Sequence, residues 1–69
     1  MLTTDSRLYR AIQARDGDAL RAAVAAGTTR RVCVGAVIYD IRRETRSGRD
    51  IIIVRENGRF LFSESVPAE

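Results

Sequence analysis

Hydrophobic residues recur at two different spacings along the chain, and the spacing changes near residue 28. Over residues 4–26 the apolar positions fall three and four residues apart, as they do on one face of a helix. After Thr28 the chain reads as apolar runs rich in β-branched residues and bounded by turn residues, which is typical of strands. The pattern therefore predicts an α+β fold in which a helical segment precedes a sheet.

Two short helices are predicted in the first segment, on either side of the sequence RDGD at residues 15–18. Thr4 or Asp5 is a suitable cap for the first helix, and Gly27 is a suitable stop for the second. Gly17 lowers the helix propensity between them. Two short antiparallel helices are favoured over one kinked helix, which would also keep the apolar side chains on a common face.

The run AIQARDGDALRAAVAAG, residues 11–27, resembles part of an ankyrin repeat. It follows that family's order of helix, tight turn, helix and terminal glycine, although Arg15 stands where the family usually turns on glycine. Ankyrin proteins need about three or more stacked repeats for stability. The resemblance therefore implies a helical hairpin and not an ankyrin protein.

Three strands are predicted from the runs RRVCVGAVIYDIRR, DIIIVRE and RFLFSE. Asn57-Gly58 is the strongest turn signal, because both residues tolerate the positive φ angles of a type I′ hairpin turn. A two-residue turn there places Val54 opposite Leu61. The expected architecture is two short N-terminal helices packed on a three-stranded antiparallel β-meander.

The turn between the first two predicted strands is less well defined by the sequence. A two-residue turn at residues 47–48 places Asp40 opposite Arg55, which is a favourable pair of opposite charges. The same register places Arg46 opposite Arg49, which is an unfavourable pair of like charges. A longer loop would relieve that repulsion, so both arrangements stay open.

Residues 1–69 are predicted to form a single domain. The helical hairpin spans about 4–26, the β-meander about 30–64, and a frayed tail 65–69, because Pro67 lacks the N–H that a strand needs. A domain of this size buries only about 60% of the surface that its unfolded chain exposes. Stabilisation by a partner surface is therefore expected.

Both faces of the predicted sheet carry large apolar side chains, whereas a half-solvated antiparallel sheet is apolar on one face only. In the second hairpin, one face carries Ile53, Phe60 and Phe62, and the other carries Ile52, Val54 and Leu61. Two alanine-rich helices cover one face, so we expect the second face to meet another protein. The alternative is that a strong twist wraps the sheet around a single core.

The residues needed for most catalytic or metal sites are missing from the sequence. It holds one cysteine, Cys33, and no histidine, so an internal disulfide is impossible and a zinc site is not expected. No phosphate-binding glycine loop or nucleophile motif is present, so we expect a non-enzymatic protein without a cofactor. Cys33 lies in the apolar run VCV and is expected to be buried.

The start of the chain, MLTTDSRLYR, lacks the continuous apolar core of a signal peptide. No apolar run approaches the length of about 20 residues that spans a membrane. We therefore expect a cytoplasmic protein with no membrane partner, in the bacterial host if a phage encodes it.

All twelve basic residues are arginines, and the net charge is +3. Guanidinium groups suit carboxylates and phosphates, so the cluster RRETRSGRD at residues 42–50 predicts contact with an acidic protein surface or with nucleic acid. The alternative is a solvated hairpin tip whose charges protect the edge of the sheet. The candidate partner-binding residues are Arg42, Arg43, Arg46, Arg49, Arg55, Arg59 and Tyr39.

In general format the chain resembles the small phage-encoded anti-CRISPR proteins, which are single cytosolic domains of this length, often α+β, without catalytic motifs. The resemblance implies an inhibitor that docks on a Cas effector complex and blocks target DNA. Several such inhibitors imitate DNA with acidic surfaces, whereas this chain is basic, so steric occlusion or capture of acidic residues is expected. Two alternatives remain open: a nucleic-acid-binding module that uses the arginine-rich hairpin, and a homodimeric accessory subunit joined through one sheet face.

Overall fold

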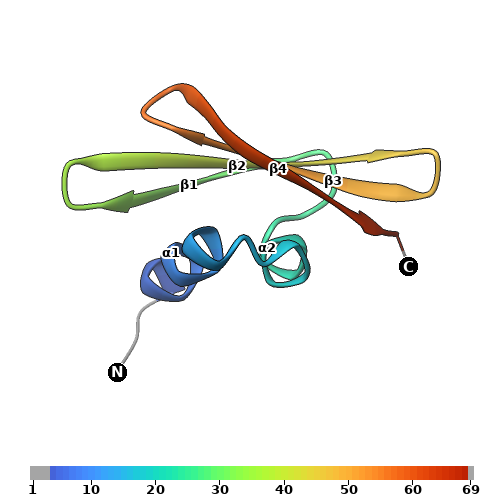
Figure 1. Ribbon diagram of the computed structural model, residues 1–69, viewed down its shortest axis with the longest axis horizontal. Coiled ribbons are helices and arrows are strands. Elements are labelled where there is room, and N and C mark those ends of the chain that lie inside the picture. The colour runs from blue at the N-terminus through green and yellow to red at the C-terminus, as the bar shows by residue number, and fades with distance from the viewer. Residues whose placement is uncertain (1–3, 69) are drawn as a thin grey trace.

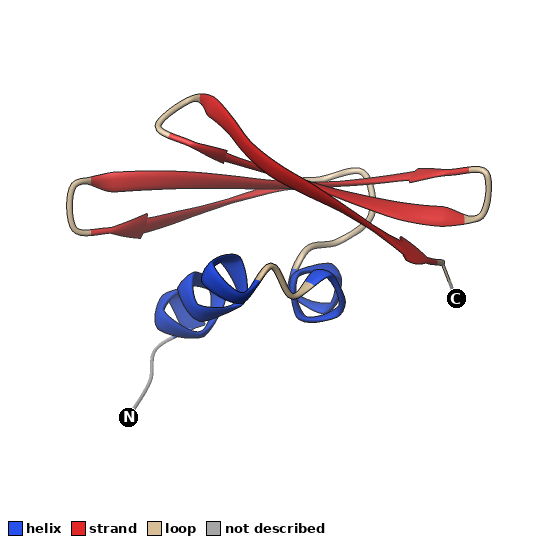
Figure 2. Ribbon diagram, viewed as in Figure 1, coloured by secondary structure: helices blue, strands red, loops and turns tan. Residues whose placement is uncertain are grey.

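The computed structural model describes residues 4–68, which form two helices followed by a four-stranded antiparallel sheet in the order β1-β2-β3-β4 (Figure 1). Both helices pack against the same face of the sheet, and neither helix covers the opposite face (Figure 2). The bounds of the elements in chain order are α1 Thr4–Ala14, α2 Gly17–Ala23, β1 Thr29–Val34, β2 Val37–Arg46, β3 Arg49–Glu56 and β4 Arg59–Pro67.

The two predicted helices are confirmed, and two backbone features separate them. Arg15 has a φ of 52°, and the N–H groups of Arg15 and Asp16 donate to the carbonyls of Ile12 and Ala11, which closes α1 with a Schellman motif. The Asp16 side chain then accepts a hydrogen bond from the Ala19 N–H and caps α2. The RDGD sequence therefore ends one helix and starts the next.

The ends of the helical segment differ in detail from the prediction. Helix α1 begins at Thr4, so Asp5 lies in its first turn and is not the N-cap, while capping by the Thr4 side chain falls outside the described atoms. Helix α2 ends at Ala23, with Val24 already extended. Gly27, with a φ of 75°, therefore does not stop the helix directly but turns the chain into β1.

The sheet has four strands, so the predicted three-stranded meander is wrong. The run RRVCVGAVIYDIRR is not one strand but two, joined by a turn at residues 35–36. Gly35 alone of these two residues has a positive φ, 60°, as the first central residue of a type II′ hairpin turn does. The turn places Val32 opposite Tyr39 and Val34 opposite Val37.

The turn between β2 and β3 has two residues, Ser47 and Gly48, and is not the longer loop that the sequence also allowed. Ser47 and Gly48 have φ angles of 50° and 74°, as a type I′ turn requires. Asp40 pairs with Arg55 in the resulting register, as the two-residue turn predicted, and Arg46 lies opposite Arg49.

A bulge alters the third hairpin. The turn at residues 57–58 is confirmed, but a register shift between Val54 and Arg55 places Val54 opposite Phe62 and leaves Leu61 as the extra residue. The predicted pairing of Val54 with Leu61 is therefore wrong. Because one residue of shift exchanges the faces of every later side chain, Phe62 turns toward the helices and is only 5% exposed.

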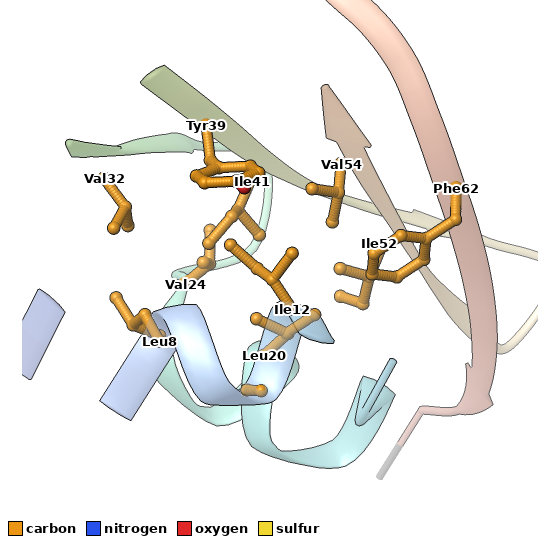
Figure 3. Close-up of a cluster of buried hydrophobic side chains, with 11 residues drawn as sticks. Leu8, Ile12, Leu20, Val24, Val32, Tyr39, Ile41, Ile52, Val54 and Phe62 are labelled. Atoms are coloured by element: carbon orange, nitrogen blue, oxygen red, sulfur yellow. The ribbon is translucent and has the colours of Figure 1, made fainter. Parts of the chain in front are cut away.

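The core lies between the two helices and one face of the sheet. In Figure 3, side chains from the strands point toward Leu8, Ile12 and Leu20 on the helices. The buried apolar side chains are Leu8, Ala11, Ile12, Leu20, Val24, Val32, Tyr39, Ile41, Ile52, Val54 and Phe62. The buried side chains of the strands all lie on one face of the sheet. The turn at Gly35 sets the pairing that brings Val32 to this face, and the bulge at Leu61 shifts β4 by one residue and brings Phe62 to it.

The C-terminal segment is more ordered than predicted. Strand β4 continues to Pro67, which pairs with Arg49, and the Ala68 N–H donates to the Gly48 carbonyl. Pro67 is tolerated because β4 is an edge strand, where a missing N–H disturbs no second ladder. The predicted frayed tail 65–69 is therefore paired as far as residue 67, and residue 69 lies outside the described part of the chain.

Candidate partner-binding face

The face of the sheet that points away from the helices, here called the outer face, is covered by neither helix (Figure 1). Alternation along each strand and the pairing between strands place its side chains in transverse rows. One row contains Arg31, Asp40, Arg55 and Phe60, and the next contains Thr29, Arg42, Ile53 and Ser63. Further rows contain Glu44, Ile51 and Ser65, and then Arg46 and Arg49.

The outer face carries two charge networks. The Arg31 guanidinium donates to the Asp40 carboxylate at 3.0 Å, and this bond raises the pKa of Arg31. The Glu44 carboxylate contacts Arg42 at 2.9 Å and Arg46 at 3.2 Å. Asp40 therefore holds one arginine of this face in place, and Glu44 holds two.

Positive charge exceeds negative charge on this face. Its charged residues are five arginines and two acids, which leaves a net charge of +3: Arg31, Arg42, Arg46, Arg49, Arg55, Asp40 and Glu44. Several of them line a shallow depression of about 440 Å³ around Ile53. An anionic surface fits this face better than a cationic one.

Apolar side chains are also exposed on the outer face. Phe60 is 65% exposed and Ile38 is 39% exposed, while Ile51 and Ile53 are half-buried. Ile38 lies near the turn of the first hairpin and Phe60 near the turn of the third. Both turns are at the opposite end of the sheet from the turn at residues 47–48 (Figure 1). The face thus has an apolar end and an arginine-rich end.

Four of the sequence-predicted residues lie on the outer face: Arg42, Arg46, Arg49 and Arg55. Arg49 donates to the hydroxyl of Ser65 at 2.7 Å and to its carbonyl at 3.2 Å. Arg59 is exposed beside the third turn, opposite Glu56, and does not share this face. The structure brings the four together along two strands.

The other two predicted residues point toward the helices. Tyr39 is 4% exposed, and its ring lies 5.9 Å from that of Tyr9. Burial raises the pKa of Tyr39, and a hydrogen bond with Glu56 raises it further. Arg43 binds the buried Asp50 carboxylate at 2.9 Å, so both Tyr39 and Arg43 belong to the interior and not to a contact surface.

The sequence reasoning missed several residues of the outer face, notably Arg31, Asp40, Ile38 and Phe60. For Arg31 the missing signal was the turn at Gly35, which pairs it with Asp40, because a Gly-X pair between two β-branched runs suits a type II′ hairpin. That turn also places Cys33 on the outer face, where it is exposed, so the prediction that Cys33 is buried is wrong.

Within residues 4–68, no three potential metal ligands gather in one place. None of the helices in this part of the chain is long and apolar enough to cross a membrane. Comparison of the chain with protein-family models, with curated proteins and with solved structures finds no match.

Proposed function

We propose that this chain is a non-enzymatic binding protein that docks on a larger protein through its outer face. The observation that carries the proposal is the uncovered face itself, which combines the exposed Phe60 and Ile38 with a net positive charge. Aromatic and arginine side chains are the residues that contribute most to binding at protein interfaces. Phe60 and Arg55, which lie opposite each other on neighbouring strands, are the expected centre of the contact.

The composition of the face favours an acidic protein surface over nucleic acid. Asp40 and Glu44 lie in the middle of the face, where they would meet the phosphates of a bound duplex. The arginine-rich hairpin is also less free than its sequence predicts, because Arg43 is bound to Asp50 while Arg42 and Arg46 contact Glu44. A second copy packed face to face would oppose two surfaces of like net charge.

The target in this proposal is a Cas effector complex, and the mode of action is that of an anti-CRISPR protein. Support for the target comes from the format of the chain, a small α+β domain with one bare sheet face. The bound protein would occlude the surface that target DNA approaches. Its net positive charge suits capture of acidic residues on the effector and not imitation of DNA.

A DNA-binding assay with purified Cas effector complexes of several CRISPR types tests the target. The protein is expected to block target DNA binding by at least one of them. The double variant Phe60→Ala, Arg55→Glu should need at least about tenfold more protein for the same inhibition, as removal of central contacts predicts. Arg7→Glu makes the same charge change on an exposed residue of α1 and should inhibit like the wild type.

Docking itself is tested separately by photo-crosslinking in cells. Benzoylphenylalanine in place of Phe60 is expected to capture a protein that the same group in place of the exposed Gln13 on α1 does not capture. Capture of nucleic acid from position 60, removed by nuclease, would favour the nucleic-acid alternative. Inhibition of no effector, with a non-Cas protein captured from position 60, would contradict the target and keep the docking proposal.

A further inference from the structure

Strand β1 forms an open edge of the sheet, because among the described residues 4–68 the only strand beside it is β2. Its pairing with β2 directs the backbone groups of alternate residues to the two sides. The Arg43 N–H and carbonyl both bond toward the chain leading into β1, while Ile38 bonds toward Asn57 on the other side. In this register the backbone N–H and C=O groups of Thr29, Arg31 and Cys33 point away from the sheet.

The two edges of the sheet differ in how they are protected. Strand β4 carries the bulge at Leu61 and ends at Pro67, and both features oppose the addition of another strand. Strand β1 pairs with β2 at six consecutive positions without a register shift and contains no proline. The β1 edge is therefore the more regular of the two and lacks a bulge and a proline.

A groove runs beside the β1 edge. Its volume is about 540 Å³, and its lining comes from the first half of α1 and the end of β1: Asp5, Ser6, Tyr9, Arg10, Cys33, Val34 and Gly35. The helix thus provides one wall and the strand edge the other. An extended backbone placed in this groove would meet the outward-pointing backbone groups of Cys33, and those of Arg31 lie two residues further along the same edge.

The charges at this edge select the chemistry of the added strand. Arg30 and Arg31 are consecutive on β1 and point to opposite faces: the Arg30 guanidinium donates to the Ala23 carbonyl at 3.2 Å, and the Arg31 guanidinium donates to Asp40. Arg10 lies in the groove, and Asp5 and Asp40 are the acidic side chains nearby. The Arg31 side chain remains 66% exposed although it contacts Asp40. A second copy of this chain would bring its own Arg30 and Arg31 to the same edge, whereas a segment with carboxylates would not be repelled.

We propose that the β1 edge binds an extended acidic segment of a partner protein by adding it as a fifth strand of the sheet. Backbone hydrogen bonds to residues 29, 31 and 33 provide the affinity, and the arginines select carboxylate side chains. Of the outer-face side chains this site uses only Arg31, together with backbone groups at the strand edge, and it does not involve Phe60 or Arg55. It is therefore tested independently of the function proposed above.

Nuclear magnetic resonance with synthetic peptides tests the site. The probe is a blocked hexapeptide of alternating glutamate and valine, and the matched controls are its lysine-valine counterpart and an N-methylated glutamate-valine peptide that cannot pair. In the free protein, the amides of Arg31 and Cys33 should exchange with solvent much faster than those of Val32 and Val34. The acidic peptide should slow exchange at Arg31 and Cys33 by at least about tenfold, as new backbone hydrogen bonds require.

Variants separate the edge from other surfaces. Arg31→Glu should weaken binding of the acidic peptide, while Arg59→Glu, an equal charge change on an exposed residue near the opposite edge, should leave it unchanged. Slow exchange at Val32 in Arg31→Glu would show that the variant is folded. The proposal is overturned if the amides of Arg31 and Cys33 stay unprotected at millimolar peptide, if all three peptides act alike, or if protection rises with protein concentration alone.

Discussion

Arg43 illustrates how the position of one residue on a strand decides its role. Arg42 and Arg43 are adjacent in the arginine-rich cluster, yet Arg42 lies on the outer face and Arg43 points toward the helices. The Arg43 guanidinium donates to the carbonyls of Arg21 and Val24 at the end of α2 and to the Asp50 carboxylate. Arg43 therefore ties the end of α2 to the sheet.

Asp50 makes the stability of the protein depend on pH. Its carboxylate is 1% exposed and accepts hydrogen bonds from Thr45 at 2.6 Å and from Arg43 at 2.9 Å. The Thr45 bond, followed by the bond and charge of Arg43, holds the pKa of Asp50 below its ordinary value against the opposing effect of burial. A lowered folded-state pKa stabilises the protein above the ordinary pKa, and this contribution is lost as pH falls through the folded-state value.

We expect thermal unfolding of the wild type to become easier below about pH 4, and Asp50→Asn to lack this part of the pH dependence. At pH 7 the variant should unfold at least about 5 °C lower, because it leaves Arg43 without its carboxylate partner. Differential scanning calorimetry from pH 7 to 2.5 measures both effects. Asp18→Asn, which changes an exposed carboxylate on α2, is the control. Parallel pH curves for wild type and Asp50→Asn would contradict the prediction.

Arg15 occupies a backbone conformation that glycine adopts more easily. Its φ of 52° is in the left-handed region, and its guanidinium lies 5.2 Å from the centre of the Phe62 ring. Arg15→Gly and Arg15→Ala both remove the contact with the Phe62 ring. The difference in stability between them therefore measures the cost of a positive φ angle at this position. Urea unfolding should show the glycine variant to be more stable than the alanine variant by about 1 kcal/mol. Equal stability would mean that the backbone is not strained at this position.

At the scale of the elements, one turn and one bulge decide which side chains reach the core. The Gly35 turn splits the first predicted strand and turns Ile38 and Cys33 outward. The bulge at Leu61 turns Phe62 inward and places Ser63 and Ser65 on the outer face. Together they gather the most deeply buried strand side chains on the face that the helices cover, while Ile38, Ile51, Ile53 and Phe60 stay on the outer face.

Gly17 sets how closely α2 approaches β4. A Cβ atom built at this position would lie 3.1 Å from the Val66 Cγ1 atom and 3.2 Å from the Glu64 Cβ atom. Gly17→Leu should therefore lower the free energy of unfolding by about 1–3 kcal/mol through overpacking. Ala19→Leu, at an exposed position of the same helix, should change it by less than about 0.5 kcal/mol. Equal effects of the two leucines in urea unfolding would contradict close packing at Gly17.

At the scale of the whole molecule, the helical segment and the turn at residues 57–58 were predictable from local residues, whereas the turn at residues 47–48 was one of two arrangements that the sequence left open. The positive φ angles of Asn57, Gly58 and Gly48 follow from residue types that tolerate them, whereas that of Ser47 does not follow from its type. The candidate site was predicted only in part, because membership of the outer face depends on strand parity. A single overlooked turn reversed the expected position of Cys33, and one unforeseen bulge altered the pairing of Val54.

The sequence by itself determined the order of helices before strands, the excess of arginine, and the shortage of residues for metal or nucleophilic chemistry. These properties depend on composition and on contacts between near neighbours. The tertiary structure decided which face each strand residue occupies, that Arg43 and Tyr39 are internal, and that β1 is left as an open edge. A strand's side chains alternate with a period of two, so a shift of one residue reverses them all, and only packing against the helices selects the register that buries the apolar set.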